Sequence, residues 1–136
     1  MIARVSRTFD EESLESNVVA LDNSYGPSLD FPTFIKRSFV HADHLVEGIA
    51  WIAENKQSKN GGIVNIAGTH TFSYYDFWIQ VARVFGIDEK RIEPRKHEIE
   101  DYPRPFRGGL NVNKARKMGV PLYSAIDGLE LIKESL

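Results

Sequence analysis

The residues with the clearest chemical potential form a basic stretch in the last third of the chain. The segment DYPRPFRGGLNVNKARKMG (101–119) places Arg104 between two prolines and Arg107 before two glycines. A guanidinium offers paired planar N–H donors that match phosphate oxygens, and the prolines reduce the backbone freedom lost when an anion binds. The segment therefore predicts either an anion-binding loop that leads into a helix or a solvated connector.

Two histidines raise the question of a metal site. His41 and His44 are three residues apart at an expected helix start, a spacing that could present two imidazoles to one metal. Asp43 between them is equally explained as an acidic residue at the positive end of the helix dipole. No further cluster of ligands accompanies them, so we expect structural histidines and no metal site. We expect His41 in particular to be buried and hydrogen-bonded.

No motif for a nucleotide cofactor is present. The chain has no G-x-G-x-x-G turn and no G-x-x-x-x-G-K-[ST] loop, and Gly61–Gly62 precedes an expected strand where a dinucleotide fold needs glycines after one. We therefore expect no catalytic and no cofactor-binding residues within this sequence.

Composition limits the classes of partner. The 136 residues include 17 basic and 19 acidic residues, so the net charge of −2 gives no general attraction to nucleic acid or to anionic membranes. There is no cysteine and no apolar run of membrane-spanning length. We expect a cytoplasmic protein that binds neither nucleic acid nor membrane.

Hydrophobic periodicity predicts alternating strands and helices. Strands are expected in MIARVS, FIKRSFV, GGIVNIAG (as an inner strand) and IDEKRIEPR (ending at Pro94), and NSYGPSLDFP (23–32) reads as a loop. Helices are expected in DEESLESNVVALD, from HADHL to KQSKNGG, in YYDFWIQVARVF after Ser73 and before Gly86, in 113–118 and from Ser124. This alternation predicts one α/β domain, with a small mixed or parallel sheet covered by helices.

Three segments carry a family resemblance, in the same order as in the family. KRSFVHADHLVEGIAWI (36–52) resembles R-D-[FY]-[IV]-H-V-x-D-L-A, and GGIVNIAGTHTFSYYDFWIQVARVFG (61–86) resembles the family's later strand, loop and helix. Segment 101–119 is similar to [YFP]-P-R/T-P-x-R…L-[DN]-x-[SNT]-K. The family is that of the extended short-chain dehydrogenase/reductases acting on nucleotide sugars, in the NAD-dependent epimerase/dehydratase superfamily. The resemblance is closest to the dTDP-4-dehydrorhamnose reductase group.

The resemblance implies which part of such an enzyme this chain represents. Residues 1–35 correspond to the last strands and loops that join the cofactor domain, and 36–136 to the C-terminal, substrate-binding part of a Rossmann-type reductase. Family arginines that approach the substrate diphosphate correspond to Arg37 and to Arg104 or Arg107, with Tyr102 and Pro103 in the same wall. Asp10 departs from the family, which commonly has glycine there.

The resemblance also implies what is missing. Complete enzymes of this family use NAD(P) and a Tyr-x-x-x-Lys pair, but none of the five tyrosines here is followed by lysine four positions later. We therefore expect a sugar-nucleotide-binding chain that cannot transfer hydride alone. It would be an expressed domain, one subunit of a split reductase or epimerase, or a relic, and it would meet a Rossmann-domain partner or self-associate through its exposed apolar surface. The alternative is a non-catalytic binding or regulatory module that associates with another protein.

Overall fold

The computed structural model describes residues 2–23, 25–55, 62–96 and 107–136. Its helices are α1 (Glu11–Asp22), α2 (Ala42–Asn55), α3 (Tyr74–Phe85), the short 3-10 helix η2 (Glu89–Arg91), α4 (Asn113–Met118) and α5 (Ala125–Glu134). Its strands are β1 (Ile2–Val5), β2 (Thr8–Phe9), β3 (Leu29–Pro32), β4 (Lys36–Arg37), β5 (Val40–His41), β6 (Ile63–Ile66), β7 (Phe72–Ser73), β8 (Ile92–Arg95) and β9 (Arg107–Gly108).

The strands form short ladders that are mainly parallel. β1 pairs with β6, β2 with β5, and β3 with β8, each in parallel. β4 lies between β7, which is antiparallel to it, and β9, which is parallel. This is the mixed α/β architecture that the alternating hydrophobic pattern predicts.

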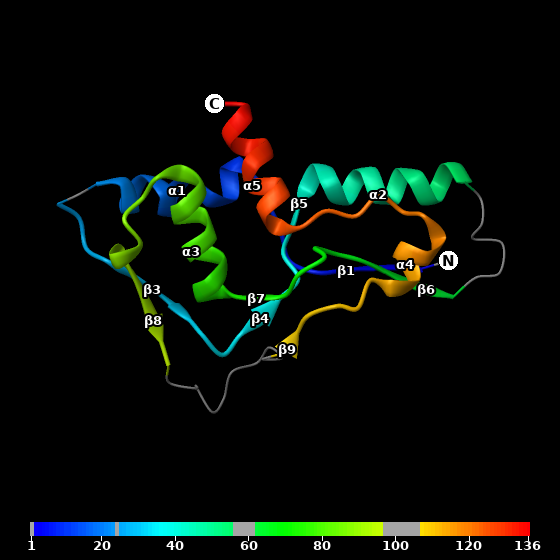
Figure 1. Cartoon of the computed structure of the whole chain (residues 1–136), viewed down its shortest axis with the longest axis horizontal. Helices are drawn as coiled ribbons and strands as arrows, with labels where there is room; N and C mark the ends of the chain where they lie inside the picture. Colours follow the sequence, from blue (N-terminus) through cyan, green and yellow to red (C-terminus); the bar gives the residue numbers. More distant parts are fainter. Residues whose placement is uncertain (1, 24, 56–61, 97–106) are drawn as a thin grey trace.

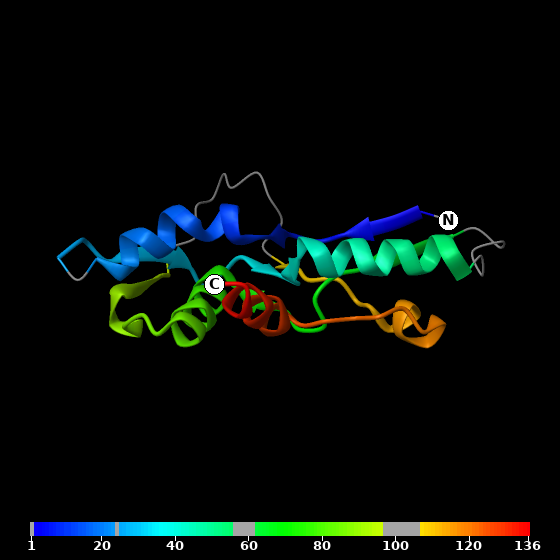
Figure 2. The same ribbon diagram turned by 90° about the horizontal axis from the view of Figure 1, so that it is seen from above.

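The molecule is elongated, with different elements at its two ends (Figure 1). One end holds α1, α3, β3 and β8, and the other holds α2, α4, β1 and β6, with α5 between them. Seen from above, α1 and β1 lie on one side, while α3, α4 and α5 lie on the other (Figure 2).

Each end has its own apolar cluster. The larger one is built from buried side chains of α1, α3 and α5 with neighbouring strands, among them Phe9, Phe39, Phe77, Val81 and Leu129. The smaller one joins β6 to the segment after α4 through Val64, Ala115 and Val120, with Trp51 and Ile52 of α2 packed against it. Burial of these faces holds the short ladders in place.

Helix ends follow the capping residues in the sequence. The Ser73 hydroxyl accepts a hydrogen bond from the Asp76 backbone N–H over 3.0 Å, and Gly86 ends α3 at φ +71°. Ser124 and Asp127 form a capping box at the start of α5. The departure at Asp10 also has a structural reason, because its carboxylate accepts from the Ser13 backbone N–H over 2.8 Å and so begins α1.

Three expectations about strands need correction. The stretch 23–32 is not a loop throughout, because Leu29–Pro32 forms β3 and pairs with β8. β8 runs one residue past the expected end, to Arg95. GGIVNIAG does form a strand, β6, but it is not an inner one: within the described residues it has β1 as its single neighbour.

None of the helices in the described ranges is long and apolar enough to span a bilayer.

Candidate functional site

Only part of the site expected from the sequence lies within the described residues. Tyr102, Pro103 and Arg104 fall outside them. Arg37 and Arg107 are in neighbouring parallel strands, where Lys36 aligns with Arg107 and Arg37 with Gly108. The fold therefore brings the backbone of Arg107 next to β4 from far along the sequence.

The Arg37 guanidinium lies against the backbone of β9. Its Nη1 donates to the carbonyl of Lys36 over 2.7 Å. A Cβ at position 108 would lie 2.5 Å from that Nη1, so only glycine leaves room for the guanidinium here. The pair of glycines after Arg107 is thus explained at Gly108 by a close approach of a cation.

A cleft of about 330 Å³ lies between α1, β2, β3 and α3, and we call it the aromatic cleft. Its floor is aromatic: Phe31 stacks on Trp78 with ring centroids 5.0 Å apart and planes 11° apart. Phe39 stacks on Phe77 at 4.2 Å and meets the edge of Tyr74 at 5.2 Å. Phe39, Phe77 and Trp78 are buried, so a ligand would meet this floor mainly at the half-buried rings of Phe31 and Tyr74.

Two arginines stand at this cleft, Arg7 before β2 and Arg95 at the end of β8. Both are exposed, so their charged groups can reach a ligand from solvent. Arg95 Nη1 lies 3.9 Å from Asp30 Oδ2, with the two side chains 45% and 56% exposed. A pair this open to water is screened and leaves Arg95 able to exchange Asp30 for a ligand anion.

Helix α1 adds neutral polar groups to the cleft. Asn17 contributes a side-chain amide that has no hydrogen-bond partner within the described residues. Ser13 also lines the cleft, but its hydroxyl is engaged with the backbone of Asp10. An aromatic floor, two guanidinium groups and an amide together suit a ligand that has a planar base and a negatively charged linker.

Sequence reasoning missed most of this cleft. Arg7 and Arg95 lie on elements that are distant in the sequence and become neighbours only through the parallel pairing of β2 with β5 and β3 with β8. One local signal in the sequence did point to this cleft: Arg95 is the first residue of a stretch rich in basic residues that ends at Lys117.

Neither histidine lines the aromatic cleft, although His41 packs edge-on against Phe9, which does. His41 is 1% exposed, and its Nδ1 accepts from the Asp43 backbone N–H over 3.0 Å at the start of α2. This confirms the expectation of a buried, hydrogen-bonded histidine. Across the described part of the chain, no three metal-ligating side chains come together.

The surroundings of His44 and Tyr123 shift the pKa values of both side chains. Burial lowers the pKa of His44, and the nearby His41 lowers it further, against the opposing effect of Glu47, Asp127 and Asp43. The hydrogen bond that Tyr123 donates to Glu47 Oε1 over 2.9 Å raises the pKa of Tyr123. Neither residue lines the aromatic cleft, so these shifts concern the packing of α2 against the segment before α5.

The described residues do not fit the pyrophosphate of a dinucleotide cofactor. Such a site needs a glycine-rich turn between the end of a parallel strand and a helix start. Here β5 continues directly into α2, and β6 is followed by β7 before α3 begins. No step of cofactor chemistry is therefore assigned to this chain.

No protein-family model matches the sequence, and no curated protein matches it either. Solved structures do match the fold. A dTDP-4-dehydrorhamnose reductase from Clostridium acetobutylicum superposes with a TM-score of 0.76 at 16% identity, over 98% of this chain and 48% of that one.

Two other solved structures match at similar levels. A dTDP-glucose 4,6-dehydratase from Bacillus anthracis, in complex with NAD, gives a TM-score of 0.68 at 18% identity, over 97% of this chain and 42% of that one. A UDP-glucuronic acid 4-epimerase from Bacillus cereus, in complex with UDP-glucuronic acid and NAD, gives 0.68 at 19% identity, over 100% of this chain and 46% of that one.

This chain spans less than half the length of each of these proteins. At these identities the likeness concerns the fold. The chain therefore has a fold that also forms part of dTDP-4-dehydrorhamnose reductases and of a dTDP-glucose 4,6-dehydratase.

Proposed function

We propose that this chain binds a sugar nucleotide, a dTDP- or UDP-sugar, as the substrate-binding part of an NAD(P)-dependent reductase or epimerase. The observation that carries the proposal is that Arg7 and Arg95 line the same cleft as the stacked rings of Phe31 and Trp78. The base would pack against the half-buried rings of Phe31 and Tyr74, and the two guanidinium groups would bind the diphosphate. The fold likeness to enzymes that act on such substrates supports the same ligand class.

The residues expected from the sequence complete this site in the proposal. We expect Arg37, Tyr102, Pro103, Arg104 and Arg107 to contribute to binding, as the family resemblance implies. Hydride transfer would need the cofactor motif and the Tyr-x-x-x-Lys pair of another polypeptide, because this sequence has neither.

A tryptophan reporter tests the proposal directly. The chain has two tryptophans, and Trp51 belongs to the other apolar cluster, so a Trp51→Phe protein reports on Trp78 alone. We expect UDP-glucose or dTDP-glucose to change Trp78 fluorescence with saturation. Arg7→Gln and Arg95→Gln should each weaken binding by about tenfold or more, as expected for loss of a charge-assisted hydrogen bond.

A matched variant controls for general loss of positive charge. The Arg83 side chain on α3 is 60% exposed and forms an ion pair with Glu89 of η2. Arg83 does not line the cleft, so Arg83→Gln should leave the affinity unchanged. Arg37→Ala and Arg104→Ala test the rest of the expected site in the same assay. If neither sugar nucleotides nor free UDP bind, the proposed function is wrong.

We also propose that a Rossmann-type polypeptide pairs with the exposed side of β1. Within the described residues β1 has β6 as its single neighbour, and all four of its residues are exposed, with Ile2 at 66% and Val5 at 44%. Parallel strands are normally buried on both faces and have further strands beside them. The solved structures that match this fold are more than twice as long as this chain.

Sedimentation of the purified chain with and without a candidate partner tests this surface. An Ile2→Lys/Val5→Lys protein should lose the association, whereas Val19→Lys, at a comparably exposed position on α1, should not. Self-association through β1 would be the other outcome expected from the sequence, and it would contradict the Rossmann-type partner. Association with a chain unrelated to dehydrogenases would replace this proposal with the binding-module alternative.

A further inference from the structure

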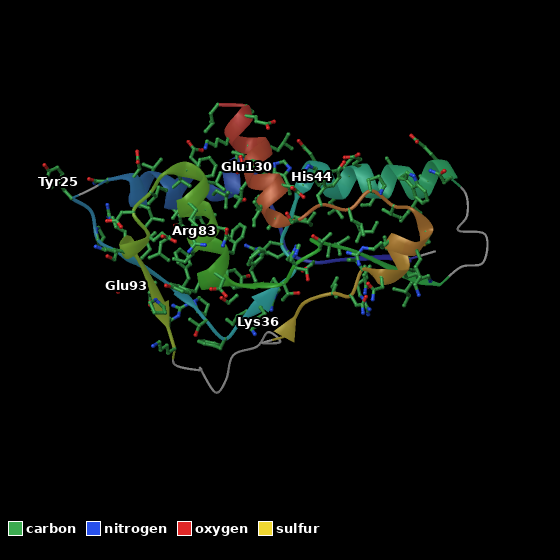
Figure 3. All side chains as sticks on the ribbon, in the orientation of Figure 1. Tyr25, Lys36, His44, Arg83, Glu93 and Glu130 are labelled. Atoms are coloured by element: carbon green, nitrogen blue, oxygen red, sulfur yellow. The ribbon has the colours of Figure 1, made fainter. Side chains whose placement is uncertain are left out.

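A second cavity lies beside β4 and is separate from the aromatic cleft. It has a volume of about 540 Å³, and its polar lining comes from Lys36, Thr69, Thr71, Asn111, Asn113 and Arg116. We call it the donor pocket. It shares no lining residue with the aromatic cleft, and the lining given by the described residues includes no aspartate or glutamate. Lys36, at its rim, is labelled beside β9 in Figure 3.

The two neighbouring cations of β4 serve different faces. Lys36 lines the donor pocket, whereas Arg37 lies against Gly108. Successive residues of a strand point to opposite faces, so the two charges are held apart by the backbone itself. Ser38 follows on the Lys36 side, where its hydroxyl contacts Thr71.

Both asparagines present hydrogen-bond donors to the pocket. Asn111 Oδ1 accepts from the Asn113 backbone N–H over 2.9 Å, and Asn113 Oδ1 accepts from Arg116 Nη1 over 3.0 Å. These bonds occupy the amide oxygens and fix the orientation of each amide group. The Nδ2 groups of Asn111 and Asn113 have no acceptor within the described residues and are free to donate to a ligand.

A buried serine orients the hydroxyl of Thr71. Ser38 is 1% exposed, and its Oγ accepts from the Leu110 backbone N–H over 3.0 Å while lying 3.1 Å from Thr71 Oγ1. When Ser38 donates its own proton to Thr71, the Thr71 proton is left to point elsewhere. Ser38 thus holds the Thr71 hydroxyl in place at the pocket, where it can donate to a ligand when Ser38 is the donor of their shared hydrogen bond.

Among the described residues, the two cations of the pocket have no acidic partner. Within the described residues Lys36 Nζ makes no ion pair or hydrogen bond, and Arg116 bonds to the neutral Asn113. Two uncompensated positive charges, two free amide N–H₂ groups and one hydroxyl donor therefore surround one open volume. A lining that offers donors and positive charge favours an anion with several acceptor oxygens.

We propose that the donor pocket binds the phosphate group of a phosphorylated small molecule. A phosphate monoester carries close to two negative charges at neutral pH, which matches Lys36 and Arg116, and its three terminal oxygens match the neutral donors. The volume leaves room for an organic group attached to the phosphate. The pocket is separate from the aromatic cleft, because the two share no lining residue.

Inorganic phosphate is the probe for the test, with chloride at equal ionic strength as the reference. We expect phosphate to shift the side-chain amide resonances of Asn111 and Asn113 and the backbone resonance of Thr71 in the full chain, with saturation. Lys36→Gln and Arg116→Gln should each weaken phosphate binding by about tenfold. Lys117→Gln, at the next exposed position of α4, should leave it unchanged.

A variant that keeps every charge separates a built pocket from a basic surface. A Cβ at position 109 would lie 2.7 Å from Thr71 Oγ1, so Gly109→Ala displaces Thr71. Phosphate binding should weaken in Gly109→Ala while the protein still unfolds cooperatively. The proposal is overturned if the phosphate shifts equal those with chloride, if Lys36→Gln and Arg116→Gln leave them unchanged, or if an RNA oligonucleotide binds these residues more tightly than phosphate. Failure of sugar nucleotides to bind at Arg7 leaves this outcome unaffected.

Discussion

The imidazole of His44 lies flat on the phenol ring of Tyr123, with ring centroids 3.9 Å apart and planes inclined by 15°. In Figure 3 His44 is at the start of α2, where α5 approaches. The stack joins α2 to the segment before α5 and removes part of the imidazole from water. An uncharged imidazole suits this position, because protonation would place a charge where hydration is reduced.

Acid should therefore weaken the fold through His44. Its pKa is lowered from the ordinary 6.5, so the folded state prefers the neutral ring. The resulting stability is present above pH 6.5 and is lost as the pH falls through the lowered folded-state pKa. The unfolding free energy, measured with urea, should fall less between neutral and mildly acid pH in His44→Gln than in the wild-type protein. His70→Gln, on an exposed loop, should keep the wild-type pH dependence, and an unchanged slope in His44→Gln would contradict this assignment.

Helix α5 should tolerate no side chain at Gly128. A Cβ there would lie 2.6 Å from His41 Cβ and 2.8 Å from Phe9 Cζ, both in the buried part of the fold. Gly128→Ala should therefore lower the unfolding free energy by about 1 to 3 kcal/mol through overpacking.

Gly86 provides the matched control for this substitution. Nothing lies within 4 Å of a Cβ there, and its φ of +71° is the sole obstacle. Gly86→Ala should cost about 1 to 2 kcal/mol, and Gly86→Asn should recover part of it because asparagine tolerates that backbone region. Gly128→Asn should show no such recovery in thermal unfolding.

Arg91 should be required for the turn that precedes β3. Its guanidinium donates to the carbonyls of Asn23, of Gly26 over 2.7 Å and of Pro27 over 3.0 Å. Lysine cannot make three such bonds in this geometry, so Arg91→Lys should cost about 1 to 3 kcal/mol in urea unfolding. Lys90→Gln, on the exposed neighbouring residue, should have little effect. Equal stability of the two variants would show that the turn does not depend on Arg91.

Removing Asp30 should strengthen anion binding at the aromatic cleft. Its carboxylate lies 3.9 Å from Arg95 Nη1 and competes with a ligand for that guanidinium. Exposed pairs of this kind are worth about 0.2 to 1 kcal/mol, so Asp30→Asn should raise the affinity for UDP by up to about fivefold. The rise should disappear when Arg95 is also Gln, as measured by Trp78 fluorescence.

Local signals in the sequence predicted the helices well. Ser73 and Gly86 mark the two ends of α3, and Ser124 marks the start of α5, because caps act on backbone groups within a few residues. The resemblance in segments 36–52 and 61–86 led to the fold that the superpositions show.

Long-range pairing left no comparable signal. β3 ends at Pro32, follows a turn rich in glycine and proline, and is defined by its ladder with β8, which also contains a proline, Pro94. Nothing within 23–32 reveals that partner. The aromatic cleft depends on the same ladder, so Arg7 and Arg95 could not be paired from the sequence. The expected contribution of Arg37, Tyr102, Pro103, Arg104 and Arg107 to ligand binding stays a prediction.

Lys36 and Arg37 follow each other in β4 and point to opposite faces of the strand, Lys36 to the donor pocket and Arg37 to the backbone at Gly108. Substitution of either residue would leave the cation on the other face in place. Inserting a single residue ahead of Lys36 would exchange the two cations and misdirect both at once. We therefore expect a substitution at Lys36 or Arg37 to disturb the molecule less than an insertion or deletion in β4.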